Sequence, residues 1–220
     1  STVLVHAVSG ADFGWRRGAL KVPDTAPDTW PALQPMGLGS PTAVLHAPEA
    51  RFPAKYRAAL WIADWSYGKI YALTLQPKGA SFAAAREEIV AGVPLPITAM
   101  CVNPVDGAIY FTTGGRRLPS ALYRLRWTET TSTSETMSAS HRPEYAVRHK
   151  LESYHGREDA HAIDDAWPAL GSADPFVRRS ARVAVESQPV AGWRERALAE
   201  TAPRAAIAAL LALARIDAKG

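Results

Sequence analysis

The stretch Pro41-Thr-Ala-Val-Leu-His46 opens a pattern of short strands that the chain repeats. Its first copy continues through Leu60-Trp-Ile-Ala-Asp64 and Ile70-Tyr-Ala-Leu-Thr-Leu75. The second copy reads Ile97-Thr-Ala-Met-Cys-Val102, Ala108-Ile-Tyr-Phe-Thr-Thr113 and Leu122-Tyr-Arg-Leu-Arg126. A repeat of about 40 to 50 residues built from three or four short strands is typical of a β-propeller blade. The repeat therefore predicts two or three blades of a propeller that is incomplete in this chain.

Composition is that of a packed globular protein. The 220 residues are 47% hydrophobic and 21% charged, with a net charge of +4. So mild and dispersed a charge argues against nucleic-acid binding. The sequence contains no run of 18 or more apolar residues, so it predicts no membrane span. It opens at Ser1 with no initiator Met or signal peptide, and we interpret it as a mature or excised piece.

Cys101 is the single cysteine. A single cysteine cannot form an intrachain disulfide or a metal site built from cysteines of this chain alone. Because Cys101 lies in an apolar strand pattern, we expect it to be a small buried side chain.

A change of composition divides the chain. Residues 128–140 are mostly Ser, Thr and Glu and have almost nothing to bury, so they predict a linker. The apolar period is two before this segment and about 3.6 after it. We therefore expect β structure over 1–127 and helices over 141–220.

Helix signals are strongest around Asp174-Pro175, an N-cap carboxylate followed by proline at the first helical position. Further helices are expected at 144–154, 160–170, 192–200 and from Pro203 onward. The expected packed face of the helix after Asp174 comprises Phe176, Val177, Ser180, Ala181, Ala184 and Val185, and its expected solvated face comprises Arg178, Arg179, Arg182 and Glu186. In the last helix, the expected apolar stripe comprises Ile207, Leu210, Leu211 and Ala214.

Several motifs carry a family resemblance. Asp174-Pro-Phe-Val-Arg-Arg-Ser-Ala-Arg182 resembles the opening of the second helix of a HEAT repeat. Gly10-Ala-Asp-Phe-Gly-Trp15 is similar to a turn of glucose/sorbosone dehydrogenase propellers, and Leu60-Trp-Ile-Ala-Asp-Trp65 and Asp106-Gly-Ala-Ile-Tyr110 fit its last blades. The chain thus resembles the C-terminal part of such a propeller followed by HEAT-like repeats, as in large bacterial propeller–HEAT–cytochrome c proteins. The expected fold class is a β-propeller fragment followed by an all-α helical repeat.

This resemblance implies pyrroloquinoline quinone and calcium in the full-length parent, which would oxidise a sugar or related alcohol outside the cytoplasm. The expected partners are the remaining propeller blades upstream and a cytochrome c domain. The chain alone is expected to be inactive because its ring cannot close. The family binds the quinone carboxylates through closely spaced arginines, whereas the matching stretch here is Gly92-Val-Pro-Leu-Pro-Ile-Thr98. The alternative is a non-catalytic scaffold that binds proteins or glycans.

The resemblance also selects candidate site residues. The candidate cofactor-binding residues are Asp12, Trp15 and Asp64, and the candidate calcium ligand is Asp12. The alternatives are a tight glycine-flanked turn for the first two and a capped strand end for Asp64. Arg116 and Arg117 favour a solvated hairpin tip over an anion site. The six histidines show no metal-ligand spacing, and the many aromatic residues favour core packing over carbohydrate stacking.

Overall fold

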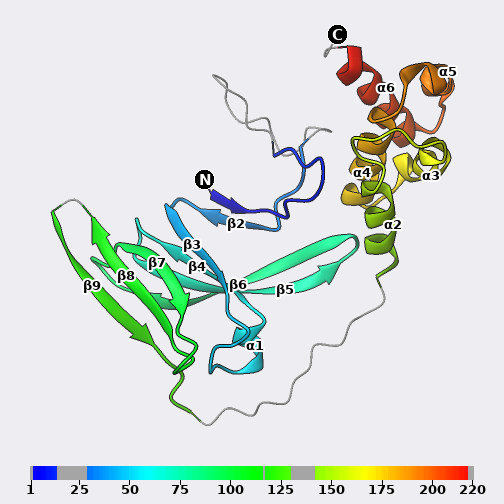
Figure 1. Cartoon of the computed structure of the whole chain (residues 1–220). Helices are drawn as coiled ribbons and strands as arrows, with labels where there is room; N and C mark the ends of the chain where they lie inside the picture. The colour runs from blue at the N-terminus through cyan, green and yellow to red at the C-terminus, as the bar shows by residue number, and fades with distance from the viewer. Residues whose placement is uncertain (1, 14–28, 116, 130–141, 218–220) are drawn as a thin grey trace. The chain divides into compact units, whose positions relative to one another are not determined.

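Two compact units make up the computed structural model (Figure 1), which describes residues 2–13, 29–115, 117–129 and 142–217. The first unit, here the β unit, contains 1–5, 32–76 and 82–140. The second, here the helical unit, contains 6–31, 77–81 and 141–220.

Three antiparallel sheets contain the described strands. Strands β1 (Thr2–Leu4) and β2 (Gln34–Gly37) form a two-stranded sheet. The four-stranded sheet runs in the order β3 (Pro41–His46), β4 (Leu60–Asp64), β5 (Lys69–Lys78) and β6 (Ser81–Ala91), and the three-stranded sheet contains β7 (Ile97–Val102), β8 (Ile109–Gly115) and β9 (Leu118–Leu125). A short helix, α1 (Ala54–Arg57), lies between β3 and β4.

The predicted strand repeat is confirmed by the pairing register. Strand β3 pairs with β4, which pairs with β5, and β7, β8 and β9 pair in the same antiparallel way. The register shifts between Pro41 and Ala43 in one sheet and between Ile97 and Ala99 in the other. Thr42 and Thr98 therefore occupy equivalent irregular positions, and the Thr42 hydroxyl donates to the Ile97 carbonyl of the neighbouring sheet at 2.8 Å.

One apolar core lies between the four-stranded and three-stranded sheets. Trp61, Ile70, Ile97 and Ile109 are almost completely buried in it. The period-two alternation places these side chains on the facing sides of the two sheets. A small sheet on its own leaves its apolar face open to water, so burial of this shared core stabilises the two sheets together.

The expected fold class is wrong. In the described residues the strands form three separate sheets of two, four and three strands, and they close neither a ring nor a barrel. With helices forming much of the rest, the fold mixes α and β structure rather than being a propeller fragment with a helical repeat. The strand period specified local antiparallel pairing, but it carries no information on how many sheets pack together.

Helices follow in the helical unit largely where the sequence predicted them. They are α2 (Pro143–Glu152), α3 (Ala162–Ala166), α4 (Pro175–Glu186), α5 (Arg194–Ala199) and α6 (Pro203–Asp217), with 3-10 turns at Trp167–Gly171 and Val190–Gly192. The Asp174 carboxylate caps α4 by accepting from Phe176 N at 2.8 Å and Val177 N at 3.1 Å, which confirms the predicted start. No helix among these described residues is long and apolar enough to cross a membrane.

Helix α4 is the centre of the helical unit, which argues against stacked repeats. It contacts α2, α3, α6 and the 3-10 turn at Trp167–Gly171, and eight of its twelve residues are buried. In a helical repeat, each unit contacts only its neighbours. The predicted packed face of α4 is confirmed, but Arg179 and Arg182 are also buried, so its expected solvated face is wrong. Arg182 and Arg215 both pair with Glu186, which compensates the buried charge.

The packing face predicted for α6 is also wrong. Ile207 is 57% exposed and Leu210 is 47% exposed, although both belong to the expected apolar stripe. The buried residues are instead Ala205, Ala208, Ala209, Ala212 and Leu213. Small alanine side chains allow the backbone of α6 to approach neighbouring elements closely. The helix therefore packs through its alanine-rich face, and the face with the larger side chains Ile207 and Leu210 is exposed.

Candidate binding pocket

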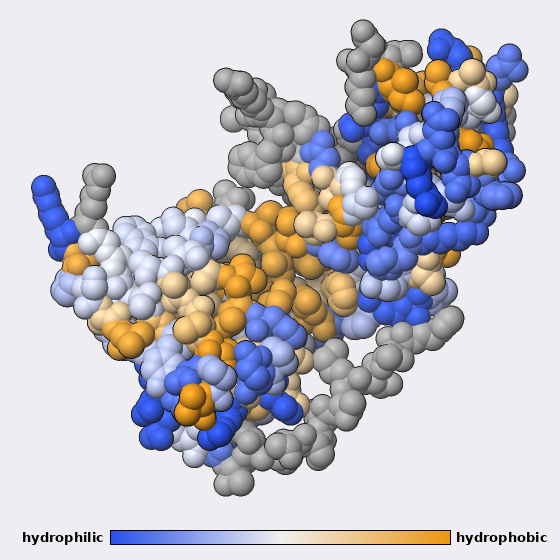
Figure 2. Space-filling view, viewed as in Figure 1, coloured by the Kyte–Doolittle hydropathy of each residue, from blue (hydrophilic) through white to orange (hydrophobic). Residues whose placement is uncertain are grey.

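An aromatic pocket of 290 Å³ opens in the β unit. It is lined by Phe52, Tyr56, Trp61, Ile89, Leu125, Arg126, Trp127, Thr128 and Glu129. These residues come from the loop after β3, from α1, from β4 and β6, and from the chain leaving β9. Figure 2 shows that apolar side chains interrupt the hydrophilic surface over the strands. A concave, mainly apolar site with a few polar groups is the usual form of a small-molecule site.

The aromatic rings of this pocket hold one another in place. Phe52 packs edge-on against Trp61 with 5.4 Å between ring centroids. Tyr56 lies 6.0 Å from Trp61 and 5.7 Å from Trp127, tilted against both. The Trp61 indole N–H donates to the Tyr56 carbonyl at 3.0 Å. The rings are therefore preorganised, and a ligand would lose little conformational freedom of the protein on binding.

Polar groups beside the pocket fix the orientation of Tyr56. Its hydroxyl donates to Glu87 Oε1 at 3.0 Å, and the Lys55 ammonium also bonds Glu87. Burial, and then the bond to Glu87, raises the pKa of Tyr56. The bonds from Lys55 and Tyr56 lower the pKa of Glu87, so this carboxylate stays ionised at neutral pH.

A second pocket, here the basic pocket, adjoins the aromatic one. It measures 280 Å³ and shares Arg126 and Trp127 with it, and its other lining residues are Arg51, Asp106, Gly107, Ala108 and Arg124. Three guanidinium groups thus surround it against one carboxylate. The pair of pockets offers an aromatic surface on one side and positive charge on the other.

Few features of the sequence indicate these pockets. Trp61 is within the propeller-like segment Leu60–Trp65, and Phe52-Pro-Ala-Lys-Tyr56 also resembles part of a blade, but aromatic residues fill cores in most folds. Tyr56 and Trp127 lie 71 positions apart in the numbering and meet only because the two sheets share a core. The alternation of Arg124 and Arg126 with Leu125 and Trp127 was the one available sign of a strand end with a charged face.

Asp64 does not have the surroundings of a cofactor ligand. It is 6% exposed, and its Oδ1 accepts from the Tyr67 backbone N–H at 2.7 Å in the turn between β4 and β5. Gly39 approaches so closely that a Cβ on it would lie 2.0 Å from Asp64 Oδ2. A carboxylate enclosed in this way caps its own turn and does not fit a quinone or calcium ligand.

The remaining sequence candidates lie in different parts of the chain. Asp12 lies in the helical unit, where its carbonyl accepts from Trp30 N at 2.8 Å, whereas Asp64 belongs to the β unit. Trp15 and Arg116 lie outside the described residues. The described part of the chain contains no group of three or more His, Cys, Asp or Glu side chains that could hold a metal ion.

Two other sequence interpretations have clear outcomes. Arg117 is exposed at the tip between β8 and β9 with a positive φ of 62°, which confirms the solvated hairpin tip. Cys101 is exposed, so the expectation of a buried thiol is wrong. It pairs with Tyr110 on the face of the three-stranded sheet that does not carry Met100 and Phe111, the residues packed in the core.

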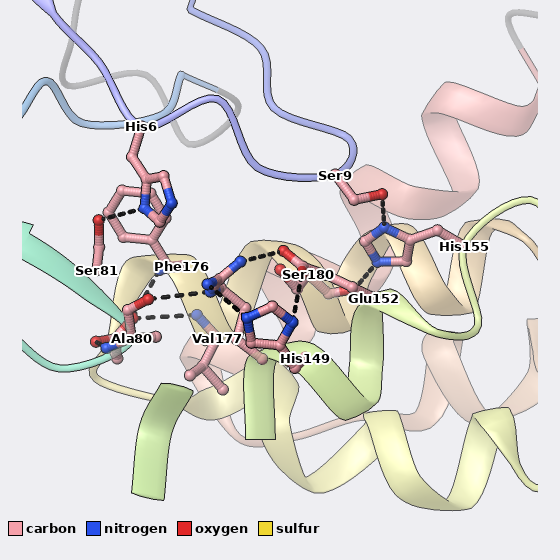
Figure 3. A network of polar contacts seen from close by, with 12 residues as sticks. His6, Ser9, Ala80, Ser81, His149, Glu152, His155, Phe176, Val177 and Ser180 are labelled. Atoms are coloured by element: carbon pink, nitrogen blue, oxygen red, sulfur yellow. Dashed lines mark hydrogen bonds and ion pairs between the residues drawn. The ribbon is translucent and has the colours of Figure 1, made fainter. Parts of the chain in front are cut away.

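The helical unit holds a dense polar network at the turn Gly79–Ser81 (Figure 3). His6 Nδ1 and Ser81 Oγ are 2.9 Å apart, Arg148 Nε donates to the Ala80 carbonyl at 3.0 Å, and Ala80 N donates to Asp174 Oδ2 at 2.9 Å. Arg148 also pairs with Glu152 at 2.5 Å. These groups bind one another, so the network fixes the turn and is a structural rather than a ligand site.

Comparison with protein-family models, with curated proteins and with solved structures found no match to this chain. The geometry of the two pockets is therefore the basis for a proposed function.

Proposed function

We propose that this chain is a non-catalytic binding module whose β unit binds a sugar ring in the aromatic pocket. The observation that carries the proposal is a pocket of 290 Å³ at which the half-buried rings of Tyr56 and Trp127 are held in place by the buried rings of Phe52 and Trp61. That volume is at the small end of the range for ligand pockets, so it suits a ligand of one or two rings.

A sugar ring matches both surfaces of this pocket. One face of a pyranose presents C–H groups, which pack on an aromatic ring, and its edge carries hydroxyls, which need hydrogen-bond partners. The pocket supplies polar partners at its rim from Arg126, Thr128 and Glu129. Tyr56 also lines the pocket, and its hydroxyl is already bonded to Glu87, so this polar group holds the ring in place for binding.

The dehydrogenase interpretation stays a prediction from the sequence. Its candidate residues are Asp12, Trp15 and Asp64, and the turn-capping role of Asp64 gives it no geometric support. The binding module needs no cofactor and uses residues that the structure brings together.

Titration of the whole chain with neutral monosaccharides tests the proposal. D-glucose, D-galactose and N-acetyl-D-glucosamine would be followed by isothermal titration calorimetry and saturation-transfer NMR. We expect binding of at least one sugar, with saturation strongest at its ring C–H protons. Replacing Trp127 by Ala should weaken binding about tenfold, because an aromatic contact contributes about 1.4 kcal/mol.

The matched control is Trp65→Ala. Trp65 is 38% exposed and lines a different hollow of the β unit, with Thr98, Thr112 and Leu122. Its loss should leave sugar affinity unchanged. If none of the sugars binds, or if Trp65→Ala weakens binding as much as Trp127→Ala, the aromatic pocket is not a sugar site.

A further inference from the structure

We infer that the ligand carries an anionic group, a carboxylate or a phosphate, which the basic pocket binds beside the ring-binding aromatic pocket. This inference rests on the proposed function, because it adds a second subsite to the same ligand. The two pockets share Arg126 and Trp127, so a single small molecule can reach both.

The arginines of the basic pocket are available to a ligand in different degrees. Arg124 lies 3.7 Å from Asp106 in an exposed ion pair, which holds it weakly. Arg51 reaches the Val105 carbonyl only at 3.4 Å. Within the described ranges, Arg126 makes no hydrogen bond or ion pair with another residue. A guanidinium offers several donors in one plane and matches the oxygens of a carboxylate or phosphate.

Asp106 offsets only part of this positive charge, because it is one carboxylate among three guanidinium groups, and its oxygens already have protein partners. Oδ1 accepts from the Ala108 backbone N–H at 3.0 Å, and Oδ2 accepts from the Tyr110 hydroxyl at 2.9 Å. The bond from Ala108, followed by that from Tyr110, lowers the pKa of Asp106, so the carboxylate is ionised at neutral pH.

Backbone geometry at Gly107 brings the Arg51 side chain close to the turn before β8. Gly107 has a φ of 66°, and a Cβ on it would lie 2.4 Å from Arg51 Cγ. The Arg51 backbone N–H donates to the Gly107 carbonyl at 2.8 Å, which fastens the loop after β3 to the turn before β8. The glycine thus lets the Arg51 side chain lie directly over this turn, where it lines the pocket with Arg124.

Paired acidic and neutral sugars test the inference on the whole chain. D-glucuronate and D-glucose 6-phosphate would each be compared with D-glucose by calorimetry at low ionic strength. We expect at least one acid to bind about tenfold more tightly than D-glucose, with an advantage that falls as salt is added. Tighter binding of glucuronate identifies a carboxylate ligand, and tighter binding of the phosphate ester identifies a phosphate ligand.

Variants locate the effect. Arg51 and Arg124 line the basic pocket but not the aromatic one. Arg51→Gln and Arg124→Gln should each reduce the ratio of acid affinity to D-glucose affinity by severalfold, while the D-glucose affinity itself stays unchanged. Arg117→Gln removes the same charge at the exposed hairpin tip and should change nothing. Thermal unfolding checks that each variant is folded.

The outcomes separate the two proposals. Acids that bind no more tightly than D-glucose overturn the anionic subsite and leave the sugar pocket intact. If the acids still bind more tightly than D-glucose in Arg51→Gln and Arg124→Gln, the anionic subsite is not in the basic pocket. Acids that bind through these arginines while every neutral sugar fails support the anionic subsite and contradict the proposed sugar recognition.

Discussion

Replacement of Gly79 by Ala tests how the turn at the end of the β5–β6 hairpin is held. Gly79 has a φ of 53°, and a Cβ there would lie 2.0 Å from Asp174 Oδ2. That oxygen accepts from Ala80 N, while Oδ1 of the same carboxylate caps α4. An added methyl group must therefore move either the turn or the capping residue.

The expected loss of stability has two parts. A left-handed backbone conformation costs an alanine about 1 kcal/mol. Displacing the Asp174 carboxylate adds about 2 kcal/mol, since a helix cap contributes about 1 kcal/mol and the hydrogen bond to Ala80 a similar amount. We expect Gly79→Ala to destabilise the helical unit by about 3 kcal/mol in total.

Gly156→Ala is the matched control. Gly156 lies in the same unit with a φ of 71°, but nothing lies within 4 Å of a Cβ built on it. It should cost only the conformational part, about 1 kcal/mol. The assay is urea unfolding followed by circular dichroism at the helical band, because α2 to α6 all belong to this unit.

A double variant identifies the contact. Serine also caps helices but lacks the second oxygen, so Asp174→Ser should bring the cost of Gly79→Ala down to that of the control. Equal losses for Gly79→Ala and Gly156→Ala in the original background would refute the reasoning, because the contact with Asp174 would then contribute nothing.

Three further predictions concern single side chains. Burial lowers the pKa of His155 below 6.5, so its contribution to the free energy of unfolding should be full above pH 6.5 and decline as the pH falls from 6.5 toward the lowered pKa. His155→Gln should make the free energy of unfolding depend less steeply on pH in this range. An unchanged dependence would show that His155 is not the group responsible. Thr42→Val removes the hydroxyl bond to the Ile97 carbonyl and should cost about 1 kcal/mol in urea unfolding, more than Thr98→Val, whose bond at the equivalent bulge is exposed. Cys101 is exposed and should react with a maleimide in the folded chain at nearly the rate seen in urea; protection from labelling would place it in an interface.

Local elements were largely predictable because their causes are close in sequence. The Asp174-Pro175 pair specified the start of α4, and the two strand repeats specified their own antiparallel pairing. Burial was less predictable. Arg182 is 2% exposed because Glu186, one turn later, pairs with it, and Ile207 is exposed because α6 packs through its alanines.

The candidate site was not predictable from the residues first selected. Asp64 is a candidate cofactor-binding residue in the sequence, but in the structure Gly39 approaches its carboxylate and the Tyr67 N–H binds it. Tyr56 ends a propeller-like segment and Trp127 carries no motif, and their rings meet only because the chain leaving β9 packs against the core of the β unit.

The sequence by itself determined where the C-terminal helices and most strands of the two repeats begin, because side-chain period, caps and proline positions act over a few residues. Tertiary structure alone decided that the sheets share a core without closing a ring, which face of α6 is buried, and where arginines meet aromatic rings. Those outcomes depend on contacts between residues far apart in the chain, and their free energies arise only when whole surfaces pack together.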